Sequence, residues 1–492
     1  MENDFASINR IPPDVLSLVP DYWNDGHRDK DTIKLTHVCR GWRELFKSRP
    51  SLWNRLDCVD VGKTHAYLER SKSSPLEISL NREGGKPRSS YRGDALRLVV
   101  PHIDRVRSLI VTAVVEDVLP DITAHFSRSA SLLEHLSIMI KCYHAPVLSP
   151  ALFNGDLSSL QTLELQGLTT DLPWNTLPNL TSFFLNNISR DKISVAVLLA
   201  FFECAPLLRN VSLEYSLPAP SDTPPKRVVT LPCLERFTVT DSFPHSTLLD
   251  HLSIPPSAFT RMAFHITSDQ VPIQNHHPKS LANFKNLYNI TQANVGLRGK
   301  SKFIQLYGPS GHHFAHGEWT GGPSCPAAVN VQMLQSVLMF DTSRVERLTV
   351  TQYAVSPQAT GEGSPPYNVL NRMVNLRVLT LTECHNLPFF VALNPEKTPG
   401  GVILCPWLTE LTLHVHLEAR FCIGELCEMA SARASRGVGL QSVTVICMQQ
   451  IKPPREVFRL RQYVSNVRYQ LEDVFPDWNV VIPVVWGPRD VK

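Results

Sequence analysis

The sequence has no uninterrupted apolar run long enough to cross a membrane. The longest candidate, residues 195–202, is ended by Glu203, whereas a spanning helix needs about 20 apolar residues. The chain begins Met1-Glu2-Asn3-Asp4, without the basic start and apolar core of a secretory signal peptide. We therefore expect the protein in the cytoplasm, the nucleus or both.

Paired cysteine motifs are also missing. The 11 cysteines are odd in number, fall singly and form no Cys-x-x-Cys pair. Disulfide frameworks and tetrahedral zinc sites use recurrent cysteine spacings, so this pattern predicts reduced thiols. The formal net charge of +3 over 492 residues is too small to indicate nucleic acid as a partner.

The sequence shows no complete catalytic or phosphate-binding motif. Residues 296–302 contain Gly296, Gly299 and Lys300 but lack the spacing of a phosphate loop. The most enzyme-like group is His313 and His316 near Ser310, yet the alternation of a strand separates neighbouring histidines onto opposite faces. The pair at 276–277 has no obvious third ligand. The sequence therefore predicts a non-catalytic protein with no cofactor and no metal.

The strongest local pattern lies between residues 11 and 53, where we predict three short helices. Prolines at 12 and 13 suit a first helical turn, because their fixed φ fits and their missing N–H is not needed there. Pro20 ends this helix, and Asp31 is the predicted N-cap of the second. The apolar positions predicted to form the inward faces are Val15, Leu16, Val19, Ile33, Leu35 and Val38. Such a small unit cannot bury enough apolar surface alone, so we expect a packing neighbour and a partner surface.

This stretch resembles an F-box, especially in the F-box-like proteins that basidiomycete fungi carry in large families. The matching residues are Ile11-Pro12-Pro13-Asp14-Val15-Leu16, Leu35, Val38-Cys39-Arg40-Gly41-Trp42-Arg43-Glu44-Leu45 and Pro50-Ser51-Leu52-Trp53. The resemblance implies docking on the Skp adaptor of SCF-type cullin–RING ubiquitin ligases, and through it on a cullin. Carried over to this chain, the docking residues are Ile11, Pro12, Leu16, Leu35, Val38, Cys39 and Trp42.

A second pattern recurs along the rest of the chain: apolar, two residues, apolar, one residue, apolar. Its eleven copies begin at Val106, Leu133, Leu160, Leu180, Leu208, Leu234, Phe259, Val345, Leu376, Leu408 and Leu440. Apart from the gap after Phe259, the starts are about 20 to 32 residues apart, which is typical of repeat proteins with one strand per unit. Helix candidates at 193–204 and 424–434 lie between copies.

The remaining segments add a hairpin and two helices to this prediction. Residues 303–307 and 312–316 flank a glycine-containing turn and predict a hairpin. Residues 327–340 and 455–469 are predicted to be helical.

The recurring pattern resembles irregular leucine-rich repeats. We therefore predict an α/β fold (α+β overall), in which a small N-terminal helical F-box-like module precedes an irregular leucine-rich-repeat-like solenoid with one short strand per repeat. The predicted domains are the helical module at 8–57, a linker helix and first strand at 58–95, and the solenoid with its C-terminal cap at 96–492.

The two resemblances together imply the substrate-recognition adaptor of an SCF-type ubiquitin ligase, whose repeats bind an unknown client protein for degradation. No nucleic acid or membrane partner is expected. Trp174, Trp319 and Trp407 are candidate client anchors, although each is equally compatible with a core position. The basic residues Arg82, Lys86, Arg88 and Arg92 suit either an acidic partner or a solvated loop.

Two alternatives to the ligase role stay open. One is an enzyme, which would need the histidine segment at 312–316 to assemble a site. Pro20 and the polar residues 24–30 interrupt the F-box pattern. A non-catalytic interaction scaffold, with a degenerate F-box that no longer joins a ligase, is therefore the second hypothesis.

Overall fold

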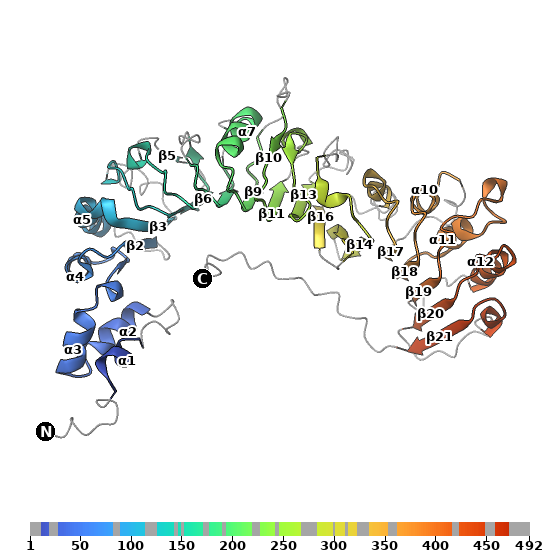
Figure 1. Ribbon diagram of the computed structural model, residues 1–492, viewed down its shortest axis with the longest axis horizontal. Coiled ribbons are helices and arrows are strands. Elements are labelled where there is room, and N and C mark those ends of the chain that lie inside the picture. The colour runs from blue at the N-terminus through green and yellow to red at the C-terminus, as the bar shows by residue number, and fades with distance from the viewer. Residues whose placement is uncertain are drawn as a thin grey trace. The chain divides into compact units, whose positions relative to one another are not determined.

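A computed structural model of the chain divides it into two compact units, residues 1–235 and 236–492. The structure describes residues 11–18, 28–81, 89–113, 125–141, 146–148, 152–170, 177–188, 193–218, 227–241, 246–266, 283–298, 301–309, 313–321, 334–352, 362–415, 423–447 and 458–471. Each unit is built on a predominantly parallel sheet (Figure 1).

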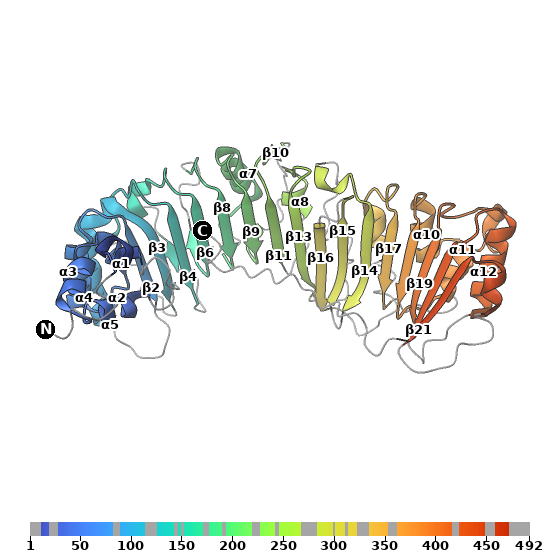
Figure 2. The same ribbon diagram turned by 60° about the horizontal axis from the view of Figure 1, so that its bottom comes forward.

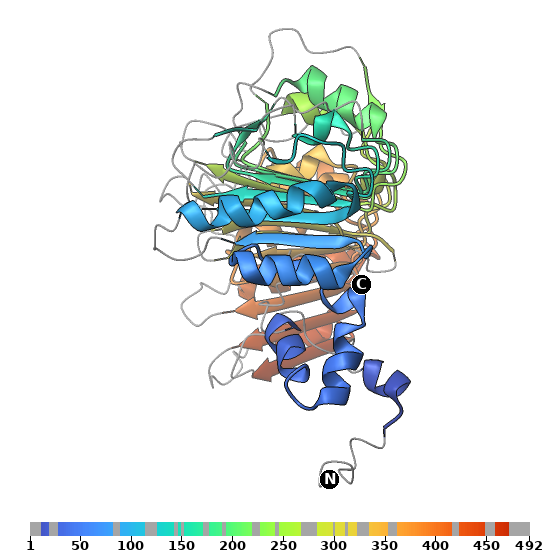
Figure 3. The ribbon, with the colours of Figure 1, turned by 90° about the vertical axis from the view of Figure 1, so that its left-hand side faces the viewer.

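The first unit begins with helices and continues into strands. Its helices are α1 (Pro13–Leu18), α2 (Arg28–Leu35), α3 (Arg40–Lys47), α4 (Val61–Ser71), α5 (Ser89–Val99) and α7 (Val195–Cys204), with 3-10 turns η5 (Pro50–Leu52), η6 (Val100–Arg105) and η7 (Leu152–Gly155). Its strands are β1 (Arg55–Leu56), β2 (Leu76–Asn81), β3 (Val106–Ala113), β4 (His135–Ile140), β5 (Val147–Leu148), β6 (Thr162–Gln166), β7 (Thr169–Thr170), β8 (Ser182–Asn186), β9 (Asn210–Glu214) and β10 (Val229–Thr230). Helices α4 and α5 pack against each other beside the first strands (Figure 3).

Strands β1, β2, β3, β4, β6, β8 and β9 pair in this order, all in parallel (Figure 2). Alternate residues of each strand are apolar, and the register aligns them across the sheet. Leu136 pairs with Leu163, which pairs with Phe183, and all three side chains are fully buried. The alternation therefore directs one face of the sheet into the core, as a period of two requires.

The second unit contains fewer helices and a mixed sheet. Its helices are α8 (Ser246–Leu249), α10 (Pro365–Arg372), α11 (Leu387–Leu393) and α12 (Ile423–Ser435), with 3-10 turns η10 (Lys285–Leu287), η11 (Val337–Met339), η12 (Pro399–Gly401) and η13 (Leu460–Gln462). Its strands are β11 (Arg236–Asp241), β12 (Leu252–Ser253), β13 (Phe259–Ile266), β14 (Gln292–Arg298), β15 (Ser301–Tyr307), β16 (His313–Gly321), β17 (Arg347–Thr351), β18 (Val378–Thr382), β19 (Glu410–Val415), β20 (Ser442–Cys447) and β21 (Asn466–Leu471).

The sheet of the second unit changes direction at one place. Strand β15 pairs antiparallel with both β14 and β16, whereas β13 pairs in parallel with β16 and β14 in parallel with β17. Strands β17 to β21 then continue in parallel. The predicted hairpin is thus present as β15 and β16, and its neighbours join the same sheet on either side.

Several parallel strands end at a residue in the left-handed region. Gly167 (φ 67°) follows β6 and donates its N–H to the carbonyl of Asn186 at 2.9 Å. Gln352 (φ 54°) follows β17 and donates to Thr382 at 2.7 Å. These residues turn the chain out of the sheet while their N–H groups remain bonded to the neighbouring strand.

The fold predicted from the sequence is wrong. The protein is a mixed α/β structure dominated by parallel sheet with an antiparallel insertion, and helices are few among the described residues, instead of an N-terminal helical module followed by a leucine-rich-repeat-like solenoid. The first helices do not form a separate module, because the chain runs from α3 through η5 into β1, and β1 pairs with β2. Between β6 and β8 the described chain contains only the short strand β7, so helices do not accompany every strand.

Two segment predictions also require correction. Of the helix predicted at 455–469, only residues 458–469 are described: 458–462 form a short helical turn that ends in η13, and β21 begins at Asn466. Of the helix predicted at 327–340, only 334–340 lie within the described residues, where a short helical turn precedes η11. The end of the predicted C-terminal cap, residues 472–492, lies outside the described residues.

Candidate partner-binding site

Helix α3 is fixed by its cap and by an aromatic pair. Cys39 has extended backbone (φ −153°, ψ 174°), and its sulfur accepts a hydrogen bond from the backbone N–H of Trp42 at 3.4 Å. A side-chain acceptor at this position satisfies one of the first N–H groups of a helix. Trp42 and Phe46 lie one turn apart and meet edge to face, with ring centroids 5.7 Å apart. These contacts orient α3 for α1 and α2, which both pack against it.

The side chains between these three helices form a small core. Leu16 of α1 is 5% exposed, Leu35 of α2 is 8% exposed, and Trp42 and Phe46 of α3 are 8% and 0% exposed. Arg43 closes one side, because its Nε donates to the carbonyl of Thr36 at 2.9 Å. The core is narrow, and one apolar side chain from each of α1 and α2 supplies much of it.

Other apolar side chains of these helices and of the residues that flank them are exposed. We call them the N-terminal apolar surface: Ile11 (38% exposed), Val15 (53%), Leu18 (48%), Ile33 (39%) and Val38 (53%). Single exposed apolar residues are ordinary, but five within one short stretch favour a surface that a partner covers. Val15 and Leu18 stand three positions apart on α1, which places them on a common helix face.

The structure divides the seven predicted docking residues into three groups. Ile11, Pro12 and Val38 are exposed. Cys39 is half-buried and caps α3. Leu16, Leu35 and Trp42 are buried in the helical core described above. Their assigned roles in docking stay predictions, but the three buried side chains have a packing role already.

The inward faces predicted for the helices were partly wrong. Val15, Ile33 and Val38 point outward, and only Leu16 and Leu35 of the predicted inward set are buried among the described residues. Short amphipathic helices can be rotated by a small angle without breaking the apolar rhythm, so the pattern alone did not fix which face is buried. Pro20 and residues 24–27 lie outside the described residues, whereas 28–30 open α2.

Trp53 connects the helices to the rest of the first unit. It is fully buried, and its Nε1–H donates to the carbonyl of Phe46 at 2.9 Å. Its ring meets Tyr67 of α4 edge to face at 5.1 Å, and the guanidinium of Arg70 lies 4.4 Å from its centroid. One side chain therefore links α3 to α4.

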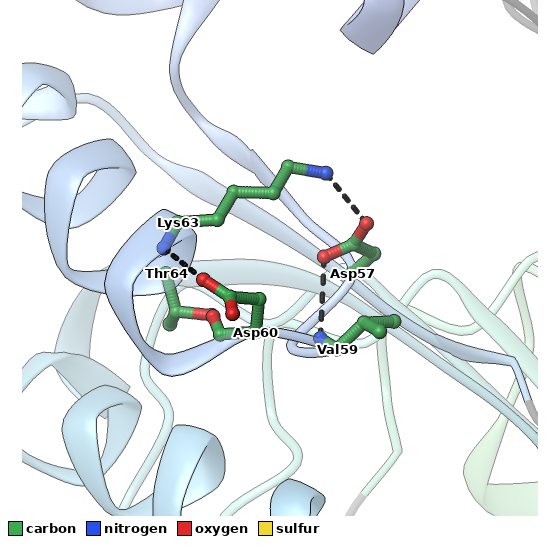
Figure 4. A network of polar contacts seen from close by, with 5 residues as sticks. All are labelled: Asp57, Val59, Asp60, Lys63 and Thr64. Atoms are coloured by element: carbon green, nitrogen blue, oxygen red, sulfur yellow. Dashed lines mark hydrogen bonds and ion pairs between the residues drawn. The ribbon is translucent and has the colours of Figure 1, made fainter.

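The start of α4 is held by a compact polar network (Figure 4). Asp60 is the N-cap, and its carboxylate accepts the backbone N–H of Lys63 at 2.7 Å. Thr64 donates its hydroxyl to the Asp60 carbonyl at 2.7 Å. Asp57 accepts the ammonium of Lys63 at 2.6 Å and the backbone N–H of Val59 at 3.3 Å. These bonds fix the connection from β1 to α4 that follows Trp53.

The candidates for chemistry and client binding are placed as follows. Trp407 is 64% exposed, whereas Trp174 and the side chain of Trp319 lie outside what the structure describes. The same holds for Arg82, Lys86 and Arg88, the side chain of Arg92, the pair at 276–277 and Ser310. His313 and His316 lie on β16, with side chains outside the description. Within the described residues, no three His, Cys, Asp or Glu side chains are grouped as metal ligands.

Among the described residues, no helix combines the length and apolar character needed to cross a membrane. No protein-family model and no curated protein matches this chain, and the F-box resemblance of residues 11–53 stays a prediction from the sequence.

Proposed function

We propose that the protein is a non-catalytic adaptor of an SCF-type cullin–RING ubiquitin ligase. In this role the helices between residues 11 and 53 dock on the Skp adaptor, and the sheet-containing part of the chain binds a client protein. The contribution to ubiquitin transfer is proximity, because the bound client is held near the enzyme that carries ubiquitin.

The observation that carries this proposal is the N-terminal apolar surface. Three of the five residues of this surface, Ile11, Val15 and Val38, are among those that carry the F-box resemblance. Docking would remove these side chains from water, which is the main favourable term in most protein association. The linkage through Trp53 would transmit the position of the helices to α4.

Binding of the purified chain to the purified Skp adaptor tests the proposal directly. The informative variant is Val15→Asp with Val38→Asp, because both side chains are about half exposed and the helical core stays intact. We expect micromolar or tighter binding by the intact chain, and binding at least about tenfold weaker by the variant, since interface hot spots each contribute more than about 1 kcal/mol. Substituting Leu35 or Trp42 instead would unfold the helices, and a loss of binding would then report on folding and not on the docking surface.

The matched control is Val374→Asp with Val402→Asp. These valines are 47% and 46% exposed but belong to the second unit. This variant should bind the adaptor as the intact chain does, and circular dichroism should show both variants folded. Failure of the intact chain to bind the adaptor would refute the ligase role and leave the scaffold hypothesis, in which the same apolar surface contacts another protein.

A further inference from the structure

The outward face of the parallel sheet in the first unit consists of three rows of side chains. We call it the polar face, and it is formed by strands β3, β4, β6, β8 and β9, which lie side by side in Figure 2. The rows are Ser108, His135, Thr162, Ser182 and Asn210; Ile110, Ser137, Glu164, Phe184 and Ser212; and Thr112, Met139, Gln166, Asn186 and Glu214.

The polar face carries negative charge. Its three rows contain two carboxylates, Glu164 and Glu214, and neither lysine nor arginine. Burial lowers the pKa of His135 despite the opposing effect of Glu164, so this imidazole is neutral near pH 7 and does not compensate the carboxylates. A cation supplied by a partner would therefore meet two carboxylates and no cationic side chain within the three rows.

Both carboxylates are held in place by neighbours in the sheet. Ser137 donates to Glu164 Oε2 at 2.8 Å, and Asn186 donates to Glu214 Oε2 at 3.2 Å. Ser212 donates to Glu214 Oε1 at 3.3 Å. A carboxylate offers about four lone-pair positions, so each group retains capacity for a further donor. Fixed acceptors lose little side-chain freedom on binding, which favours recognition.

An aromatic ring lies between the two acidic positions. Phe184 is half-buried and pairs in register with Glu164 of β6 and with Ser212 of β9. Glu214 lies two residues after Ser212 on β9, diagonally across from Phe184. A half-exposed phenyl ring offers a surface for the methylene stem of lysine or arginine and attracts their charged ends. Carboxylate and ring are thus arranged for one class of side chain.

We propose that the polar face binds an extended segment of a partner protein that presents lysine or arginine side chains to Glu164, Phe184 and Glu214. The two carboxylates lie two strands apart across the sheet and one row, or two residues, apart along it. Standard sheet dimensions put this separation at about 12 Å. An extended segment covers about 13 Å in four residues and keeps the same face, so cations four residues apart match the spacing. This inference rests on the proposed function, because it takes the partner to be the client protein. It adds that the bound client segment is basic.

The test is direct binding of a fluorescent twelve-residue peptide with three arginines, one at every fourth position, among serines and glycines. Fluorescence anisotropy at about 50 mM salt should show saturable binding that weakens as salt is raised, because screening shortens the reach of exposed charges. The variant Glu164→Gln with Glu214→Gln keeps the shape of both side chains and one acceptor oxygen in each, and removes both negative charges. We expect it to bind about tenfold more weakly, since each exposed ion pair contributes up to about 1 kcal/mol.

Two controls separate this site from general attraction. Glu410→Gln removes one exposed carboxylate of the second unit and should leave binding unchanged, and Phe184→Leu should weaken binding while keeping the charge. Equal binding by the double variant and the intact chain, equal binding of a matched glutamate peptide, or no binding of the arginine peptide would each overturn the inference. The assay omits the Skp adaptor, so its failure is distinguishable from failure of adaptor docking.

Discussion

The indole Nε1 of Trp53 donates a hydrogen bond to the backbone carbonyl oxygen of Phe46 at 2.9 Å, and both side chains are fully buried. This bond satisfies a carbonyl near the end of α3, where helices leave acceptors without intrahelical partners. The same indole packs on Tyr67. A single residue therefore joins the candidate docking helices to the first helix of the sheet region.

Replacing Trp53 with Phe should separate the two roles of the indole. The ring contact with Tyr67 is largely retained, but the Phe46 carbonyl loses the indole donor and keeps only the backbone N–H of Arg49 at 3.3 Å. We therefore expect the free energy of unfolding to fall by about 1 kcal/mol. Trp407→Phe, at a site that is 64% exposed, should change stability by less than about 0.5 kcal/mol. Urea denaturation of both variants measures the difference, and equal stabilities would show that the hydrogen bond contributes little.

Gly167→Ala should be strongly destabilising. Gly167 has φ +67°, and a Cβ there would lie 2.0 Å from the carbonyl oxygen of Ile140, a backbone atom that cannot move aside cheaply. We expect a loss of at least about 2 kcal/mol from strain and overpacking together. Gly363→Ala is the control, since φ is +80° but nothing lies within 4 Å, and it should lose only about 1 kcal/mol. Similar losses in thermal unfolding would contradict the role of the close approach.

Arg105→Met should destabilise the first unit. Arg105 is 8% exposed and donates to the Ser71 hydroxyl at 3.2 Å and to the Ser74 carbonyl at 3.0 Å, so its guanidinium closes the end of α4. Loss of these donors to buried acceptors should lower the free energy of unfolding by about 2 to 4 kcal/mol. Arg97→Met removes an exposed pair with Asp94 and should change it by less than about 0.5 kcal/mol. The comparison requires chemical denaturation under identical conditions.

Acidification should destabilise the first unit through His135. Burial lowers the pKa of this imidazole in the folded protein below its ordinary value of 6.5. Between the folded pKa and the ordinary pKa of the unfolded chain, the unfolded chain binds the proton more readily than the folded protein does. The contribution to stability is complete above pH 6.5 and declines as the pH falls toward the lower pKa of the folded state. His135→Gln should reduce the loss of stability between about pH 7.5 and pH 5.5.

An imidazole NMR titration of the intact chain supplies an independent reading of the same effect. A midpoint for His135 at or above 6.5 would contradict this account.

The sequence predicted the strands of the sheet better than their assembly. Leu160-Gln-Thr-Leu163-Glu-Leu165 alternates as a strand must, and β6 occupies this position. This alternation does not indicate which strands pair with each other or whether they pair in parallel. Strand β15 runs antiparallel between β14 and β16. The overall architecture was mispredicted because the partner and direction of a strand are decided by its neighbours in the sheet, which a local sequence window does not contain.

Near the C-terminus, at residues 455–469, the sequence predicted the wrong type of secondary structure for β21. Val457, Leu460, Val464 and Val467 fit a helical spacing, but Val467, Tyr469 and Leu471 also alternate, and the pairing of β21 with β20 decided in favour of the strand. At the candidate site, sequence identified the three helices but not their rotation. Val15, Leu18 and Ile33 were missed as surface residues because each is apolar, and only packing distinguishes an exposed valine from a buried one.

The register of the parallel strands has a consequence for how the chain folds as it is made. Leu136 pairs with Leu163, and Val378 pairs with Glu410, so most neighbouring parallel strands join residues about thirty positions apart in a chain of 492. Contacts of such short range form quickly compared with the long-range pairings that slow most sheets. Each new strand can therefore add to its predecessor soon after leaving the ribosome, and exposed strand edges are covered while synthesis continues.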